Sequence, residues 1–141
     1  MIKSIIFDFD GVILDTVEVK GDSFVELYKN ESNEVKKKIK KYHFSNLGVS
    51  RYKKINYIGN NFLDFDKKKT NSYYLKTFEE IVKKKIKKSN YIYGIKKFIK
   101  DNYKKYLFFI SSATPQNKLY EIVKYKKIHP FFREVLGSPD N

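Results

Sequence analysis

The sequence has no cysteine among its 141 residues. Disulfide bonds and metal sites built on thiolates are therefore excluded, and we expect a cytoplasmic protein, because a chain without cysteine fits a reducing compartment. No run of about eighteen apolar residues occurs, so the sequence offers no membrane span. The N-terminus lacks a basic segment followed by an apolar core, so we expect no secretory signal peptide.

Arginine is scarce in a strongly basic chain. The net charge is +14, yet Arg51 and Arg133 are the only arginines. Proteins that read bases or grip phosphates usually use the planar guanidinium fork, whereas short lysine clusters supply the charge here. We therefore do not expect a nucleic-acid-binding protein, although a non-catalytic polyanion-binding protein remains the alternative outside the enzymes. The same charge would attract small phosphorylated substrates.

The stretch KSIIFDFDGVILDT, residues 3–16, carries the strongest chemical pattern in the chain. Its apolar run at residues 5–7 predicts a buried strand. Asp8 and Asp10 follow directly, where open α/β sheets place their ligands. Gly11 permits a turn after Asp10, so both carboxylates can serve one site, one as nucleophile and one as proton donor. Two carboxylates this close need a compensating charge, and Mg²⁺, which prefers oxygen ligands, is the natural one.

Two other kinds of site use closely spaced aspartates. A calcium-binding EF-hand loop is excluded, because Val12 and Ile13 stand where that loop needs an oxygen ligand and a glycine. The DxD motif of glycosyltransferases stays open, but we would expect it well inside a nucleotide-binding domain rather than near residue 8.

The segment FDFDGVILDT resembles the first motif of the haloacid dehalogenase (HAD) superfamily, whose members are mostly phosphatases. The resemblance implies that Asp8 attacks phosphorus and forms an aspartyl-phosphate. It also implies that Asp10 protonates the leaving group and then activates water, with Mg²⁺ bound at Asp8 and Asp10. The dehalogenase activity that names the superfamily needs no metal and fits this pattern less well.

Residues 16–90 show helical patterns and no strand pattern. Apolar residues recur at helical spacing in four stretches, residues 17–30, 34–42, 50–62 and 74–86. A helical block between two strands predicts an inserted cap. HAD phosphatases of the phosphoglycolate phosphatase and β-phosphoglucomutase type have a four-helix cap at this point. We therefore expect a core of residues 1–15 and 91–141 and a cap of residues 16–90, with a separate helical bundle as the alternative.

Two cap residues are candidates for substrate recognition. Arg51 lies in the segment GVSRYKK, which is similar to a segment of other capped HAD hydrolases. The guanidinium group of Arg51 would bind a carboxylate or phosphate of the substrate. The alternative is an exposed arginine paired with an acid. His43 is a weaker candidate, for which a buried, hydrogen-bonded histidine is the alternative. We expect the cap lysines to form a solvated face.

The run YLFFI predicts a second buried strand, which ends before Ser111 and Ser112. Thr114 as cap and Pro115 at the first helical position then predict the start of a helix. A hydroxyl beside a helix N-terminus is a good phosphate cradle. The order matches the second HAD motif, which implies phosphate binding by Ser111, and we expect Ser112 and Gly11 to add contacts.

The last residues of the sequence predict a third strand at residues 134–136, and the sequence ends at Asn141. The resemblance implies a later lysine and further acids, which do not occur before Asn141. We therefore predict an incomplete Rossmann-like α/β sheet of about three parallel strands, with its first strand as an exposed edge prone to self-association. The expected function is a Mg²⁺-dependent phosphatase of a small phosphorylated metabolite, impaired in this chain. A phosphosugar mutase on the same scaffold is the alternative.

Overall fold

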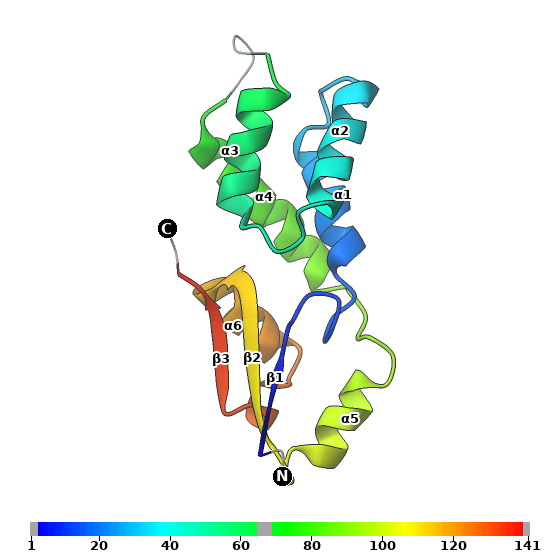
Figure 1. The fold of residues 1–141 in the computed structure, drawn as a ribbon, viewed down its shortest axis with the longest axis vertical. Helices are drawn as coiled ribbons and strands as arrows, with labels where there is room; N and C mark the ends of the chain where they lie inside the picture. The colour runs from blue at the N-terminus through cyan, green and yellow to red at the C-terminus, as the bar shows by residue number, and fades with distance from the viewer. Residues whose placement is uncertain (1–2, 65–68, 140–141) are drawn as a thin grey trace. The chain divides into compact units, whose positions relative to one another are not determined.

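The structure is a computed structural model that describes residues 3–64 and 69–139. It divides into two compact units, one formed by Met1–Thr16 with Ile86–Asn141 and the other by Val17–Lys85. The first unit contains a β-sheet, and the described residues of the second are built of helices (Figure 1).

The sheet has three strands in the order β1 (Ser4–Phe7), β2 (Leu107–Pro115), β3 (Glu134–Ser138). Both neighbouring pairs are parallel, with Phe7 opposite Ile110 and Ile110 opposite Val135. Parallel strands need long connections, and helix α6 (Gln116–Tyr125) with the 3-10 helix η2 (His129–Phe131) joins β2 to β3. Helix α5 (Ile95–Asn102) precedes β2. The predicted three-stranded parallel α/β sheet is thereby confirmed.

One face of this sheet forms the core of the first unit. Phe7 and Phe108 are buried there, with their ring centroids 5.0 Å apart. Phe98 of α5 contacts Phe7 edge-on at 6.3 Å, and α6 lies against β2 and β3 (Figure 1). Burial of these aromatic side chains is the main favourable contribution to the stability of this unit.

The opposite face of the sheet is uncovered among the described residues. Ile6 is 69%, Leu107 56% and Leu136 49% exposed. Our prediction that the first two strands are buried is therefore wrong for this face, because no described helix lies on it and side chains alternate between faces. The expected position of β1 at the edge is confirmed for the described strands.

The second unit has four helices, as predicted: α1 (Val17–Leu27), α2 (Asn33–Phe44), α3 (Arg51–Asn61) and α4 (Asn71–Ile86). Its core cluster contains residues from all four helices, namely Phe24, Tyr28, Ile39, Ile55, Ile58, Tyr74 and Phe78. Ser50 caps α3, because its hydroxyl accepts a hydrogen bond from the Lys53 N–H at 3.5 Å. The sequence also predicts a charged loop at residues 64–71, of which residues 65–68 lie outside the described residues.

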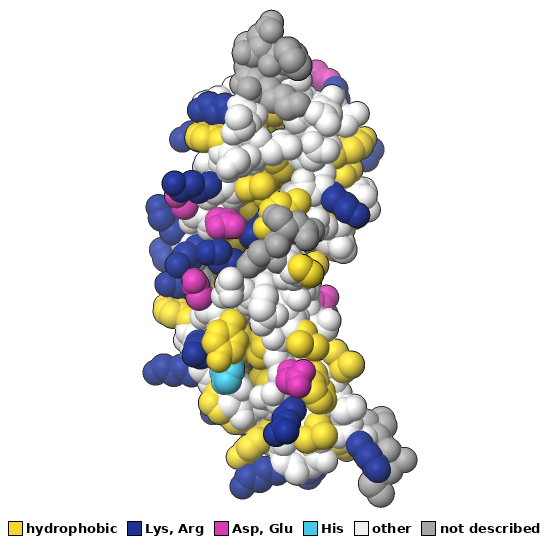
Figure 2. All heavy atoms as spheres, turned by 90° about the vertical axis from the view of Figure 1, so that its left-hand side faces the viewer, with side chains coloured by type: hydrophobic (Ala, Val, Ile, Leu, Met, Phe, Trp, Pro, Cys, Tyr) yellow, Lys and Arg dark blue, Asp and Glu magenta, His cyan; other side chains and the backbone are white. Residues whose placement is uncertain are grey.

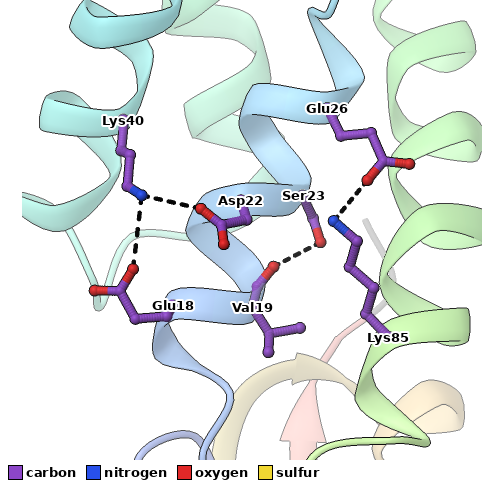
Figure 3. Close-up of polar contacts among 7 residues, drawn as sticks. All are labelled: Glu18, Val19, Asp22, Ser23, Glu26, Lys40 and Lys85. Carbon is purple, nitrogen blue, oxygen red and sulfur yellow. Dashed lines mark hydrogen bonds and ion pairs between the residues drawn. The ribbon is translucent and has the colours of Figure 1, made fainter.

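Lys and Arg side chains are scattered over the visible surface, with apolar side chains between them (Figure 2). In the second unit, Lys40 contacts Asp22 at 3.0 Å and Glu18 at 3.7 Å (Figure 3). Such exposed pairs contribute little to stability, so these lysines form a solvated face. No helix within the described ranges is long and apolar enough to cross a membrane.

Candidate active site

The chain turns sharply after β1, and the turn presents two aspartates. Gly11 has a φ of 75°, and its N–H donates a hydrogen bond to the Leu14 carbonyl at 2.8 Å. Phe9 and Leu14 are completely buried beneath the turn. Asp8 is exposed and Asp10 is half-buried. The apolar side chains thus anchor the turn, while the carboxylates stay near the surface.

Residues 90–92 pair with the residues that follow this turn. Leu14 forms an antiparallel bridge with Tyr91. The Asp15 N–H donates to the Asn90 carbonyl at 2.9 Å, and the Ile92 N–H donates to the Ile13 carbonyl at 3.1 Å. These main-chain hydrogen bonds fix the residues that follow Asp10, up to Asp15. The turn that carries the two aspartates is therefore held in place by residues 90–92 as well as by β1.

The Asp8 side chain has one oxygen fixed and one available. Its Oδ1 accepts a hydrogen bond from the Phe9 N–H at 2.6 Å. No other described residue donates to this carboxylate. An exposed carboxylate with a free oxygen at the end of a strand can act as a nucleophile or as a metal ligand.

Two threonine hydroxyls hold the Asp10 carboxylate. Thr16 Oγ1 donates to Oδ1 at 2.6 Å, and Thr114 Oγ1 donates to Oδ2 at 3.4 Å. A hydroxyl can both donate and accept, so these partners suit the charged and the protonated form of the acid. Asp10 is therefore fixed in position, as a general acid and base requires.

The structure corrects the expected start of α6. Thr114 does not cap this helix, because Pro115 occupies the N-cap position and offers no side-chain cap. Strand β2 also continues to Pro115 instead of ending before Ser111. Our sequence reasoning missed Thr16 and Thr114 as partners of Asp10, since nothing in the local pattern shows which hydroxyl reaches an acid.

Ser111 follows the β2 residue that pairs with the end of β1. Phe7 is opposite Ile110, so Asp8 and Ser111 come one step later on adjacent parallel strands. Ser111 is exposed. Ser112 Oγ accepts a hydrogen bond from the Thr114 N–H at 3.1 Å, so it shapes the turn towards α6. The first unit thus brings the two aspartates and the predicted serines to the carboxyl ends of two adjacent parallel strands.

Gly137 lets β3 pass close to the residues that connect β2 to α6. A Cβ on Gly137 would lie 2.6 Å from the Thr114 carbonyl oxygen and 2.6 Å from the Gln116 Cα. The Gln116 side chain donates to the Val135 carbonyl at 2.8 Å and accepts from the Gly137 N–H at 2.6 Å. These contacts, which the sequence did not reveal, connect β3 to the residues that support Asp10.

Arg51 lies in the second unit and is paired with an acid. Its Nη2 lies 2.6 Å from Glu79 Oε1, and its guanidinium carbon lies 5.2 Å from the Tyr52 ring centroid. The side chain is 14% exposed. The pairing with an acid matches the alternative considered for Arg51, although that alternative was an exposed arginine, and the contact of Arg51 with substrate stays a prediction.

His43 is buried in the same unit and contacts a buried lysine. His43 is 4% and Lys54 2% exposed, and Lys54 Nζ lies 3.2 Å from His43 Nδ1. Burial, followed by the nearby charge of Lys20, lowers the pKa of Lys54 to about 8. Our expectation that the cap lysines form a solvated face is therefore wrong for Lys54. The sequence did not indicate that Lys54 is buried, because a lysine in a helix is normally expected on the face exposed to solvent.

The residues that would hold Mg²⁺ in the first unit are oxygen donors. They are the free oxygen of Asp8 and the main-chain carbonyl of Asp10, and oxygen donors fit this ion, which usually keeps several waters. Within residues 3–64 and 69–139, no group of three or more His, Cys, Asp or Glu residues is placed to hold a metal.

Solved structures with the same fold are numerous. A protein assigned as a β-phosphoglucomutase from Thermotoga maritima has a TM-score of 0.69 at 15% identity, with 96% of this chain and 61% of that chain covered. YfnB from Bacillus subtilis, assigned as a HAD hydrolase and bound to magnesium, has a TM-score of 0.69 at 15% identity, with coverage of 97% and 65%. A predicted phosphoglycolate phosphatase from Haemophilus somnus has a TM-score of 0.75 at 16% identity, with coverage of 96% and 62%.

The chain therefore spans less than two thirds of these similar structures. A search of curated protein sequences found no match. The family model for haloacid dehalogenase-like hydrolases matches residues 5–141, which is nearly the whole chain. The match includes the aspartates after β1 and the serines of β2. The chain belongs to the haloacid dehalogenase-like hydrolase family.

Proposed function

We propose that the protein is a Mg²⁺-dependent phosphatase that acts on a small phosphorylated metabolite through an aspartyl-phosphate. The observation that carries this proposal is the pair of aspartates after β1. Asp8 is exposed with a free oxygen, whereas Asp10 is held by two hydroxyls. Membership of a hydrolase family, a similar structure bound to magnesium and a similar predicted phosphatase support it.

The two aspartates take different roles in the proposed reaction. Asp8 attacks phosphorus, the bond to the leaving oxygen breaks, and protonated Asp10 gives its proton to that oxygen. Asp10 then takes a proton from the water that attacks the aspartyl-phosphate, which releases phosphate and restores Asp8. Bound Mg²⁺ would compensate the negative charge of Asp8 and the phosphoryl group. Gly11, Ser111 and Ser112 would contact the phosphoryl oxygens through N–H and O–H donors.

We further propose that the residues between the two core segments, 16–90, act as a cap. Caps exclude water and contribute residues that recognise the substrate. Arg51 and His43 remain the proposed recognition residues, although Arg51 would have to share its guanidinium between Glu79 and the substrate. The cytoplasm remains our proposed location.

Turnover of p-nitrophenyl phosphate with Mg²⁺ tests the proposal. Asp8→Asn should abolish turnover, because an amide is a far weaker nucleophile than a carboxylate. Asp15→Asn is the matched control: Asp15 is exposed in the same segment, and its replacement should leave the rate unchanged. Because we expect the activity of this chain to be impaired, the rates are compared with the background without protein, and equal rates above that background for wild type and Asp8→Asn would refute the role of Asp8.

The similar structure assigned as a β-phosphoglucomutase favours a second candidate, a phosphosugar mutase. A mutase returns the phosphoryl group to a sugar and releases little phosphate, so product analysis separates the two reactions. The alternative of a polyanion-binding protein predicts binding of nucleic acid that weakens steeply with salt and survives Asp8→Asn.

A further inference from the structure

Lys126, the C-cap residue of α6, binds the segment that follows α4. Its Nζ donates hydrogen bonds to the Ser89 carbonyl at 2.6 Å and to the Lys87 carbonyl at 3.1 Å. The residue is half-buried, and burial lowers the pKa of its amine. A lysine amine suits carbonyl oxygens at the end of a helix, because a charged amine has donors only. Helix α6 is thereby tied to a segment 37 positions earlier in the chain.

Tyr91 makes a second connection between the same two parts of the chain. Its hydroxyl donates to the Lys126 carbonyl at 2.8 Å, and Lys126 Nζ lies 5.7 Å from the centroid of its ring. The carbonyl of a C-cap residue has no partner within its own helix, so the Tyr91 hydroxyl supplies one. Lys127, the next residue, has a φ of 57°, which a residue with a side chain disfavours. Such a conformation persists where surrounding contacts hold it, and the bonds at Lys126 are contacts of this kind.

The segment held by Lys126 supports one oxygen of the Asp10 carboxylate. Residues 90–92 form the main-chain hydrogen bonds and the bridge to residues 13–15 described above. Thr16 follows directly, and its hydroxyl donates to Asp10 Oδ1 at 2.6 Å. The position of the Thr16 hydroxyl therefore depends on residues 90–92 and, through them, on Lys126.

The other end of α6 supports the second oxygen of the same carboxylate. Thr114 precedes the N-cap residue of α6, and its hydroxyl donates to Asp10 Oδ2 at 3.4 Å. The helix has ten residues, so its two ends lie ~15 Å apart. Both threonine hydroxyls thus depend on one helix, Thr114 at its start and Thr16 through Lys126 at its end. All of these residues belong to the first unit.

We propose that Lys126 is a positioning residue for Asp10, and that it acts through the carbonyl groups of Ser89 and Lys87. Resting on the proposed phosphatase function, Lys126 keeps the Thr16 hydroxyl, and with it Asp10, in place to give a proton to the leaving oxygen. A displacement of about 1 Å is enough to slow such a step strongly. Tyr91 has the same role through the Lys126 carbonyl.

Amide hydrogen exchange tests this role without turnover. Lys126→Met removes the donors and keeps the aliphatic chain, and it should raise the exchange rate of the Asp15 N–H about tenfold, because the segment that accepts this bond is released. The Arg133 N–H, which donates to the Phe108 carbonyl at 2.7 Å, should keep its rate. Lys124→Met removes the same charge from an exposed position of α6 and should change neither rate. An unchanged rate at Asp15, or an equal rise at Arg133, would overturn the proposal.

Two further variants distinguish the hydrogen bonds from general stability. Lys126→Arg keeps donors at this position and should restore most of the protection of Asp15; no restoration would mean that the donors do not hold the segment. Should Lys126→Met fail to fold, Tyr91→Phe decides the matter, because it removes only the hydroxyl and keeps the main-chain pairing. It should raise the exchange rate of Asp15 about threefold, and an unchanged rate would overturn the connection between α6 and the turn.

The link to the reaction is tested with two esters, propyl phosphate and p-nitrophenyl phosphate, each measured against the background without protein. Propoxide needs a proton to leave, whereas p-nitrophenolate needs little help from an acid. Lys126→Met should therefore lower kcat/KM about tenfold for propyl phosphate but only about twofold for p-nitrophenyl phosphate, and Lys124→Met should change neither.

An equal reduction for the two esters would overturn the role of Lys126 in placing the acid, because general damage to the fold affects both alike. No turnover of either ester by wild type would overturn the phosphatase function itself. The exchange rates would still decide whether Lys126 holds the turn that carries Asp10.

Discussion

Replacing Lys54 by methionine should stabilise the protein and remove a pH dependence of its stability. In the folded state the pKa of Lys54 is lowered from 10.5 to about 8, mainly by burial. Below pH 8 the amine is charged in both states, and the folded state carries the cost of a buried charge. A difference of 2.5 pKa units corresponds to about 3 kcal/mol of unfolding free energy at pH 7.

The sign of the pH dependence follows from proton binding. Between about pH 8 and 10.5 the unfolded chain keeps the proton on Lys54 and the folded chain has lost it. Stability therefore rises with pH in this range, by about 2 kcal/mol from pH 8 to pH 10. Burial raises the pKa of Tyr28 well above its usual value. Tyr28 therefore lowers stability only above about pH 10, where the unfolded phenol ionises first.

Urea unfolding followed by circular dichroism at pH 7, 8, 9 and 10 measures this effect. Wild type and Lys53→Met should gain stability from pH 8 to pH 10, because Lys53 is exposed and its removal leaves Lys54 in place. Lys54→Met should be more stable at pH 7 and should lack the gain. The nearest titratable neighbours, His43 and Lys20, remain in both variants. An equal gain in Lys54→Met, or a loss of stability at pH 7, would refute the reasoning.

Three further changes test the supports of the site and the sheet edge. Thr16→Val removes the hydroxyl that donates to Asp10 at 2.6 Å and should lower kcat about tenfold, measured with p-nitrophenyl phosphate; an unchanged rate would exclude this support. Gly137→Ala places a Cβ 2.6 Å from the Thr114 carbonyl oxygen and should cost about 1–3 kcal/mol, seen as a lower Tm; an unchanged Tm would show that the contact relaxes freely. Self-association at the exposed edge strand stays a prediction: sedimentation velocity should show concentration-dependent assembly that Ile6→Lys removes, and a monomeric wild type would contradict it.

Patterns that depend on near neighbours could be predicted from the sequence. The apolar run before Asp8 and the glycine after Asp10 predicted a strand followed by a turn, and the structure has both. Apolar residues at helical spacing in residues 50–62 predicted a helix, and α3 lies there, because helical spacing depends only on the next few residues. The three-stranded parallel sheet followed from strands separated by helices.

Contacts between distant parts of the chain could not be predicted in the same way. Thr114 reaches Asp10 across 104 positions, and no local pattern distinguishes it from a helix cap. Lys54 looked solvated because a lysine beside Ile55 is usually exposed, and only the packing of α1 and α2 shows that it is buried. The exposure of Ile6 likewise depends on what covers the sheet, which a strand pattern does not specify.

The central claim is that Asp8 is the residue that accepts the phosphoryl group. It can be tested by incubating the protein with Mg²⁺ and acetyl phosphate, reducing with borohydride, and analysing the peptides by mass spectrometry. Borohydride converts an acyl phosphate into an alcohol, so the account predicts a lighter peptide modified at Asp8, absent without acetyl phosphate and absent in Asp8→Asn. Modification at another carboxylate, or at Asp8 without a phosphoryl donor, would contradict the account.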